Sequence, residues 1–176
     1  ITLGTAITGA GFSLSITNNA IISAAISGFS SVTVGGTTSL GGNVTTTGAQ
    51  TYTGAVTMTA DRTLSSTSNG AINLAAINGA FALTISNGSG AITLSTVGAT
   101  TPLTTFTSQG TGLNTLNGDI NTSGAVDLRG TSRQNTFAAN RAITTTNSSG
   151  NGNITLGTTN SGYSLTLNPG SDSVSL

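Results

Sequence analysis

Apolar and small polar residues alternate in short runs along the whole chain, for example in Val32-Thr33-Val34, Val56-Thr57-Met58 and Ile92-Thr93-Leu94. Apolar side chains at positions i and i+2 line one side of a strand, so each run predicts a short strand with one buried face. No stretch shows the 3.6-residue period over the ten or more residues that a helix needs. We therefore expect an all-β protein.

The amino-acid composition argues against several other classes of protein. Of the 176 residues, 101 are Thr, Ser, Asn or Gly, and the charged residues are four Arg and four Asp, which gives zero net charge. A mean hydropathy of +0.19 without net charge does not fit ordinary disorder. Four dispersed Arg do not make the basic patch of a nucleic-acid binder. No apolar run approaches the roughly 20 residues of a membrane span, and without Cys there are no disulfides.

The strand-like runs are separated by Asn-Gly pairs, which tolerate positive φ and therefore mark corners. Asn-Gly is also a strong signal for a two-residue hairpin, so a β-sandwich made of hairpins is the main alternative. The runs are very short, the repeats are long-range, and sandwich surfaces usually carry interspersed charge, all of which count against the sandwich. The pairs are Asn69-Gly70, Asn78-Gly79, Asn87-Gly88, Asn117-Gly118 and Asn151-Gly152.

A parallel β-solenoid accounts for all three observations. Like positions of successive coils stack about 4.8 Å apart, where identical charges would repel, so Thr, Ser and Asn are favoured on the surface. Stacked Asn can form amide ladders, and stacked Val, Ile and Leu fill the interior. With about 20 to 25 residues per coil, the sequence predicts a parallel β-solenoid (β-helix) of roughly eight short coils.

One sequence motif, which we call the repeated phrase, occurs three times. It defines long repeats over residues 1–71 and 72–153, with the start of a third over 154–176. Its first part is Ile1-Thr2-Leu3, Ile72-Asn73-Leu74 and Ile154-Thr155-Leu156. Its second part contains Leu14 and Ile16, Leu83 and Ile85, and Leu165 and Leu167. We expect these six side chains to point inward at equivalent positions. Both ends are strand-like, so we also expect further solenoid, from the same or a neighbouring chain, to cover them.

The segment from Gly41 to Leu64, Gly-Gly-Asn-Val-Thr-Thr-Thr-Gly-Ala-Gln-Thr-Tyr-Thr-Gly-Ala-Val-Thr-Met-Thr-Ala-Asp-Arg-Thr-Leu, resembles the repeat region of filamentous-haemagglutinin-like exoproteins. The resemblance is good over residues 32–94 and looser over 103–176. These proteins are large bacterial surface adhesins with right-handed β-solenoid shafts, many of them exported by two-partner secretion. The resemblance implies a secreted, cell-surface structural protein. No functional residue carries over, because nothing here matches the secretion domain or a receptor-binding segment.

The residue inventory argues against catalysis and against cofactor or metal binding. Acid–base chemistry needs gathered titratable groups, but Asp61, Asp119, Asp127 and Asp172 are dispersed. Asp119 and Asp127 are the closest pair and could flank a cation only if coils brought them together; solvated loop carboxylates are the favoured interpretation. His, Cys, Lys and Glu are absent, so the many Ser and Thr have no general base. We expect no catalytic, cofactor-binding or metal-binding residues.

The remaining Arg and aromatic residues have structural interpretations. Arg129, Arg133 and Arg141 fall in the least repetitive stretch, 129–141, which we expect to be a solvated loop, with a partner contact as the alternative. Asp61-Arg62 is expected to be an exposed corner pair. Phe12, Phe81 and Tyr163 occupy equivalent repeat positions, which favours core or corner stacking over a sugar-binding platform.

These observations lead to one main hypothesis and one alternative. The main hypothesis is a non-catalytic shaft segment of a secreted, surface-exposed bacterial adhesin or extracellular fibre, whose ligand would lie on a host, cell or matrix surface. The alternative is a Thr-rich β-solenoid that binds ice or another solid surface. The latter needs Thr at the same place on successive coils, and Thr51-Tyr52-Thr53 and similar motifs are unevenly spaced along the sequence.

Overall fold

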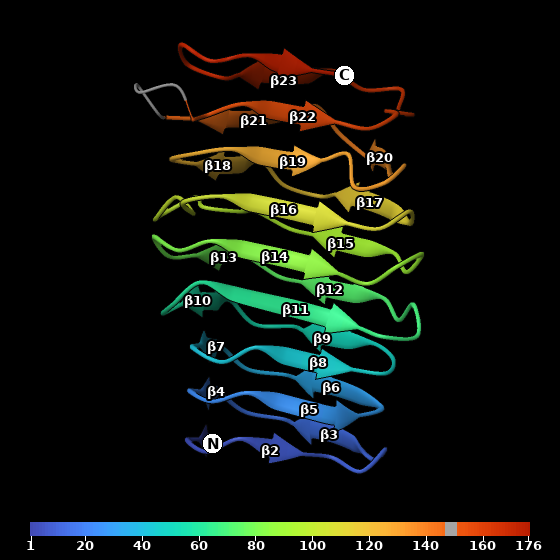
Figure 1. Ribbon diagram of the computed structural model, residues 1–176. Helices are drawn as coiled ribbons and strands as arrows, with labels where there is room; N and C mark the ends of the chain where they lie inside the picture. Colours follow the sequence, from blue (N-terminus) through green and yellow to red (C-terminus); the bar gives the residue numbers. More distant parts are fainter. Residues whose placement is uncertain (147–150) are drawn as a thin grey trace.

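The computed structural model describes residues 1–146 and 151–176 and contains parallel β-strands with no helix among them (Figure 1). The strands form three stacks, which we call faces A, B and C. Face A contains β1 (Thr2–Leu3), β4 (Ala20–Ile22), β7 (Thr38–Leu40), β10 (Val56–Met58), β13 (Ile77–Asn78), β18 (Ile120–Thr122), β21 (Arg141–Thr145) and β23 (Leu165–Asn168). Isolated bridges through Val97 join β13 to β18 and make the face continuous.

Face B has nine strands and face C has seven. Face B contains β2 (Ile7–Thr8), β5 (Ile26–Phe29), β8 (Val44–Thr46), β11 (Arg62–Ser66), β14 (Leu83–Ser86), β16 (Phe106–Gln109), β19 (Val126–Leu128), β22 (Ile154–Leu156) and β24 (Val174–Ser175). Face C contains β3 (Ser13–Ile16), β6 (Ser31–Val34), β9 (Gln50–Tyr52), β12 (Ile72–Leu74), β15 (Ile92–Leu94), β17 (Leu113–Leu116) and β20 (Gln134–Phe137).

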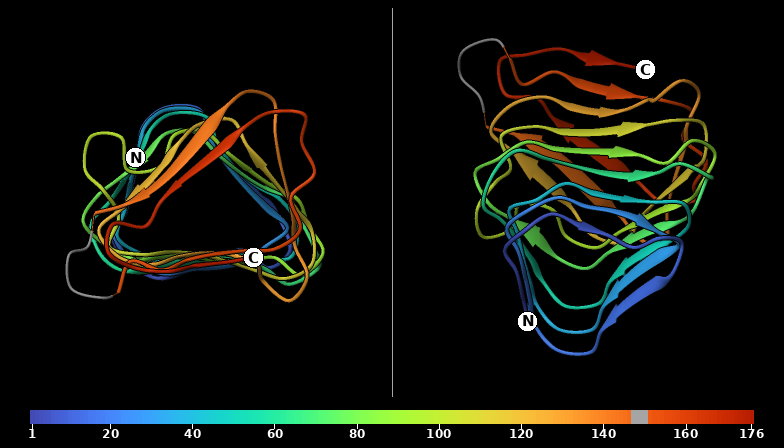
Figure 2. Two further views of the ribbon diagram at one scale, coloured as in Figure 1. Left: turned by 90° about the horizontal axis from the view of Figure 1, so that it is seen from above. Right: turned by 60° about the horizontal axis from the view of Figure 1, so that its bottom comes forward.

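The chain runs through faces A, B and C in turn and climbs as a right-handed coil with a triangular cross-section (Figure 2). Because every pairing between described strands is parallel and joins successive coils, the hairpin sandwich is excluded. About eight coils are present, as expected. The register gives 18 residues per coil between Ile21 and Ser39 and 24 between Ile143 and Leu167, so the earliest coils are shorter than the sequence predicted.

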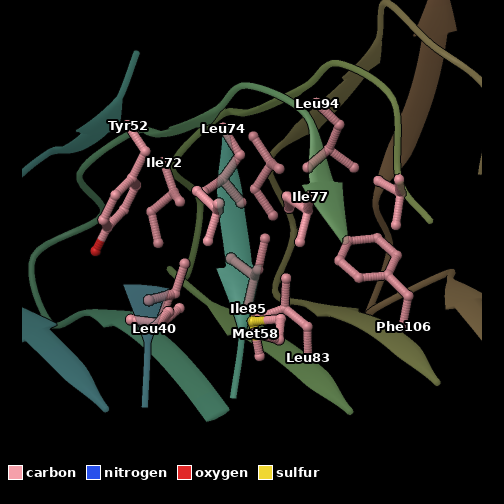
Figure 3. Packing of buried hydrophobic residues seen from close by; sticks show 14 of the residues in the cluster. Leu40, Tyr52, Met58, Ile72, Leu74, Ile77, Leu83, Ile85, Leu94 and Phe106 are labelled. Atoms are coloured by element: carbon pink, nitrogen blue, oxygen red, sulfur yellow. The ribbon is translucent and has the colours of Figure 1, made fainter. Parts of the chain in front are cut away.

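A continuous apolar column fills the interior of the triangle (Figure 3). The alternating runs supply it, since Val56 and Met58 on face A, and Ile92 and Leu94 on face C, are all at most 2% exposed. The four buried aromatic residues are Phe29, Tyr52, Phe106 and Phe137. Of the six side chains expected to point inward, Ile16, Leu83 and Ile85 are buried, while Leu14, Leu165 and Leu167 are half-buried against the same column. Their inward direction is confirmed.

The expectation that the three copies place these side chains at equivalent positions is wrong as to the face. Leu14 lies on face C, Leu83 on face B and Leu165 on face A. The first copy of the phrase begins at β1 and the second at β12, a step of eleven strands in a three-sided coil. The third begins at β22, again eleven positions later once the bridge at Val97 is counted. Each copy is therefore turned by one face relative to the copy before it.

The Asn-Gly pairs lie at corners, as predicted, and Asn69 adopts positive φ (62°) there. Close approach of successive corners explains several glycines. A Cβ at Gly112 would collide with the backbone carbonyl oxygen of Gly90 in the coil below, whereas a Cβ at Gly162 would meet nothing within 4 Å. No described segment is a helix long and apolar enough to cross a bilayer.

Candidate functional site

The Asp side chains act as corner caps. Oδ1 of Asp61 accepts a hydrogen bond from the backbone N–H of Ala82 (2.8 Å), and Oδ1 of Asp119 accepts one from Ala142 N–H (2.9 Å). Asn residues do the same at other corners, as with Asn43 and the Thr63 N–H (3.0 Å). Each of these bonds ties one coil to the next. Asp61 and Asp119 therefore have the same structural role as Asn, which needs no charge.

The two remaining carboxylates also bind backbone N–H groups. Oδ1 of Asp127 accepts from Arg129 N–H (2.9 Å), and Oδ2 of Asp172 accepts from Gly152 N–H (2.8 Å). Asp119 precedes face A and Asp127 lies on face B, so the coil does not make them a pair of ligands. Within residues 1–146 and 151–176, no three His, Cys, Asp or Glu side chains gather as a metal site would require.

The stretch 129–141 is not the solvated loop that the sequence predicted. It contains β20 and the first residue of β21, and Arg133 is 0% exposed. The Arg133 guanidinium reaches down the corner between faces B and C, where it donates to the backbone oxygens of Gln109 (2.7 Å) and Gly90 (3.2 Å) and to Oδ1 of Asn87. Burial lowers the pKa of this guanidinium below its ordinary value. Arg129, by contrast, is exposed, as expected.

Other buried polar side chains continue along the same corner. The side chain of Gln50 donates to Ser65 O (2.8 Å) and Val44 O (3.1 Å), and Tyr52 donates to Gln50 Oε1 (3.2 Å). Higher up, Nδ2 of Asn114 donates to Oδ1 of Asn135 in the coil above (2.9 Å), which is a buried amide ladder. These groups are satisfied within the protein, and none of them faces a ligand cavity. Sequence reasoning did not identify this column, because polar neighbours such as Thr51, Thr115 and Thr136 make its members look like outward residues of their strands.

Two surface recesses accompany the later coils. The larger, about 440 Å³, is mainly apolar and is lined by Arg129, Ser132, Leu156, Gly157, Thr158, Thr159 and Leu176. The other, about 330 Å³, is polar, and Asp127 is its only titratable side chain. Neither lining includes a nucleophile paired with a base.

The aromatic residues that the sequence aligned do not form a platform. Phe12 (75% exposed) precedes β3, Phe81 precedes β14, and Tyr163 (53% exposed) precedes β23. They lie at corners leading to three different faces, in agreement with the turning of the repeat. Phe81 packs against the core, so only Phe81 has the stacking role that was expected for all three.

Face C is the one side of the coil whose described strands carry no charged residue; Arg62 and Asp127 lie on face B, and Arg141 on face A. Its outward residues form aligned columns. The middle column is Ser15, Thr33, Thr51, Asn73, Thr93, Thr115 and Thr136. The column beside it is Ser13, Ser31, Ala49, Ala71, Ala91, Leu113 and Gln134. Thr residues that are unevenly spaced in the sequence therefore lie one strand apart along face C.

The column beside the Thr residues contains small side chains apart from Leu113 and Gln134, and Leu113 is 40% exposed. Face C is thus an uncharged and partly apolar surface. Comparison with known proteins gives no further assignment: no protein-family model, no curated protein and no solved structure matches this chain.

Proposed function

We propose that this chain is a non-catalytic shaft segment of a secreted, surface-exposed adhesin or extracellular fibre. One observation carries the proposal: three stacks of parallel strands surround one apolar cluster through about eight coils, with isolated bridges at Val97 joining the two sheets of face A. In such an array each coil contacts only its neighbours, so stiffness and stability grow with the number of coils. The resemblance of residues 32–94 to filamentous-haemagglutinin-like repeats supports the same function.

The chemistry of the side chains is consistent with this function. All four carboxylates bind backbone N–H groups, and the buried Arg133 binds backbone and amide oxygens. Asp61, Asp119, Asp172 and Arg133 thus join one coil to another, and Asp127 binds within its own coil. In an adhesin of this kind the ligand-binding part is carried at a distance from the cell, and further coils of the same or neighbouring chains extend the shaft.

Labelling of intact source cells with an antibody against this segment, followed by electron microscopy, tests the proposal. We expect label on rods outside the cell envelope, with about 5 Å of rod length per coil. Label confined to the cell interior, or on compact particles of fixed size, would show that the segment is not part of a surface shaft.

The Thr column of face C favours a second candidate, binding to ice or another ordered solid. Thr93, Thr115 and Thr136 are directly in register, with neighbouring strands about 4.8 Å apart. A thermal hysteresis assay tests this function. Ice shaping that is lost in Thr93→Arg would support it, and growth of ice at its ordinary freezing point would eliminate it.

A further inference from the structure

We propose that the corner Asn117-Gly118 is a site of spontaneous covalent modification, at which the Asn117 amide is converted to a carboxylate while the protein is folded. An Asn followed by Gly is especially open to this reaction, because Gly has no side chain to shield its backbone nitrogen. The chain contains five such pairs, and the structure separates one of them from the other four. The proposal concerns this corner alone and holds whether or not the chain belongs to a surface shaft.

Water is the only co-reactant. The backbone nitrogen of Gly118 forms a bond to Cγ of Asn117, and the Cγ–Nδ2 bond breaks, so that the Gly118 proton leaves with the amide nitrogen as ammonia. Water then opens the resulting succinimide ring at either carbonyl. One opening gives Asp, and the other gives isoaspartate, in which the main chain runs through Cβ and Cγ. Hydrogen bonds to the Asn amide or to the Gly N–H keep these two groups apart and slow the reaction.

Two of the other pairs are held at both reacting groups. In Asn69-Gly70, the Asn Oδ1 accepts a hydrogen bond from Ser89 N–H (3.0 Å), and the Gly N–H donates to Oγ of Ser66 (2.8 Å). In Asn78-Gly79, the Asn Oδ1 accepts from two backbone N–H groups of the coil above (2.8 and 3.2 Å), and the Gly N–H donates to Thr101 O (3.1 Å). We expect both pairs to be protected in the folded protein.

The next two pairs are held at one reacting group each. Asn87 is 0% exposed, and its Nδ2 donates to Ala91 O (3.1 Å), so the amide of Asn87-Gly88 is fixed and shielded from water. In Asn151-Gly152, the Gly N–H donates to Oδ2 of Asp172 (2.8 Å), which restrains the attacking nitrogen. These pairs are therefore protected too, by different contacts.

Asn117-Gly118 differs from all four. The Asn117 side chain is exposed, and within residues 1–146 and 151–176 neither its amide nor the Gly118 N–H forms a hydrogen bond. The backbone on both sides of the pair is nevertheless tied down, since Asn117 N–H donates to Leu94 O (2.7 Å) and the Asp119 carboxylate caps Ala142 N–H (2.9 Å). The two groups that must react are thus the unbound part of an otherwise fixed corner.

The isoaspartate product would disturb this corner. It lengthens the main chain by one carbon just before Gly118, where a Cβ on that residue would already lie 2.5 Å from the backbone nitrogen of Thr96 in the coil below. The lengthened chain also displaces Asp119, whose carboxylate links this coil to the next. Plain Asp at position 117 adds a charge but no main-chain atom. We therefore expect isoaspartate, and not Asp, to weaken the contact between these coils.

Incubation of the folded chain at mildly alkaline pH, followed by peptide mapping with mass spectrometry, tests the proposal. Asn117 should convert at least about fivefold faster than any other Asn-Gly pair, the factor that corresponds to one typical hydrogen bond. In urea, where these bonds are lost, all five pairs should convert at similar rates. Another pair converting as fast as Asn117 in the folded protein, or conversion of Asn117 only in urea, would overturn the proposal.

A variant that releases a protected pair tests the cause. Asp172→Ala removes the acceptor of the Gly152 N–H and should accelerate conversion of Asn151 about fivefold, whereas Asp172→Asn keeps an acceptor and should not. Circular dichroism checks that both variants are folded, and an equal rate at Asn151 in the two would contradict protection by hydrogen bonding and overturn the proposal. Thermal melts then test the consequence: the incubated chain should melt lower as its isoaspartate content rises, and fresh Asn117→Asp should melt like the unmodified chain.

Discussion

The guanidinium of Arg133 donates a hydrogen bond to the side-chain oxygen of Asn87, which lies 46 residues earlier in the chain. It also binds Gln109 O one coil below, so a single side chain links three successive coils at one corner. Replacement by Met should destabilise the fold by about 3 kcal/mol, because buried oxygens of Asn87, Gly90 and Gln109 lose their donor. Urea unfolding measures the loss. Arg129→Met, at an exposed position, is the control and should change the stability by less than about 0.5 kcal/mol.

The apolar column predicts a large effect at Leu83, which is 1% exposed. Leu83→Asn should lower the free energy of unfolding by about 3 kcal/mol or more, since it removes apolar contacts and buries an unpaired amide. Thr84→Asn, on the outward side of the same strand, should be nearly neutral. Thermal melts compare the two variants, and an unchanged melting temperature for Leu83→Asn would contradict the packing described above.

Tyr52 predicts a pH dependence in the alkaline range. Burial raises the pKa of its hydroxyl well above the ordinary value of 10.0, so the folded protein keeps a proton that the unfolded chain loses. Stability from this group is complete below pH 10 and falls above it by about 1.4 kcal/mol per pH unit. Urea unfolding at pH 9 and 11 should show the decrease. Tyr52→Phe should remove this slope, and an equal slope in the variant would assign the alkaline loss to other groups.

The close contact of corners predicts that Gly112 cannot carry a side chain. Its φ is not in the left-handed region, so the cost of Gly112→Ala is steric: the new methyl group meets the carbonyl oxygen of Gly90, part of a backbone that cannot move without breaking its ladder. We expect a destabilisation of about 3 kcal/mol by denaturant unfolding. Gly162→Ala, in open space, should cost less than about 1 kcal/mol.

The role of Asp119 can be separated from cation binding. As a corner cap, its carboxylate is needed only as an acceptor for Ala142 N–H, so Asp119→Asn should be nearly neutral and Asp119→Ala should cost about 1 kcal/mol. Addition of Ca²⁺ should leave the melting temperature unchanged in all three proteins. A calcium-dependent rise that disappears in Asp119→Asn would indicate a metal site instead.

The sequence was sufficient to predict the fold because each strand carries its own signal. The alternation in Ile92-Thr93-Leu94 identifies the buried side, and Asn69-Gly70 identifies a corner, with no information from distant residues. The face on which a strand lies is not encoded in this way. Leu14, Leu83 and Leu165 lie in the same local sequence pattern but on three different faces, so similarity of sequence could not assign them to a face.

The position of Arg133 could not be predicted for a different reason. An isolated Arg in a polar stretch has the sequence pattern of a surface residue, and the acceptors that make its burial tolerable come from coils completed 24 and 46 residues earlier. The alignment of Thr on face C was likewise hidden, because the coils differ in length and only the strand register restores an even column.

The step of eleven strands per repeat has a consequence for how the molecule meets its surroundings. Each copy of the repeat is rotated about the coil axis by one face, a third of a turn, relative to the copy before it. Three consecutive copies therefore place the same motif on three different faces. In a longer array, a surface motif carried by three consecutive copies would appear once on each face of the rod. Equivalent positions of successive copies therefore lie on different faces and at different heights along the axis.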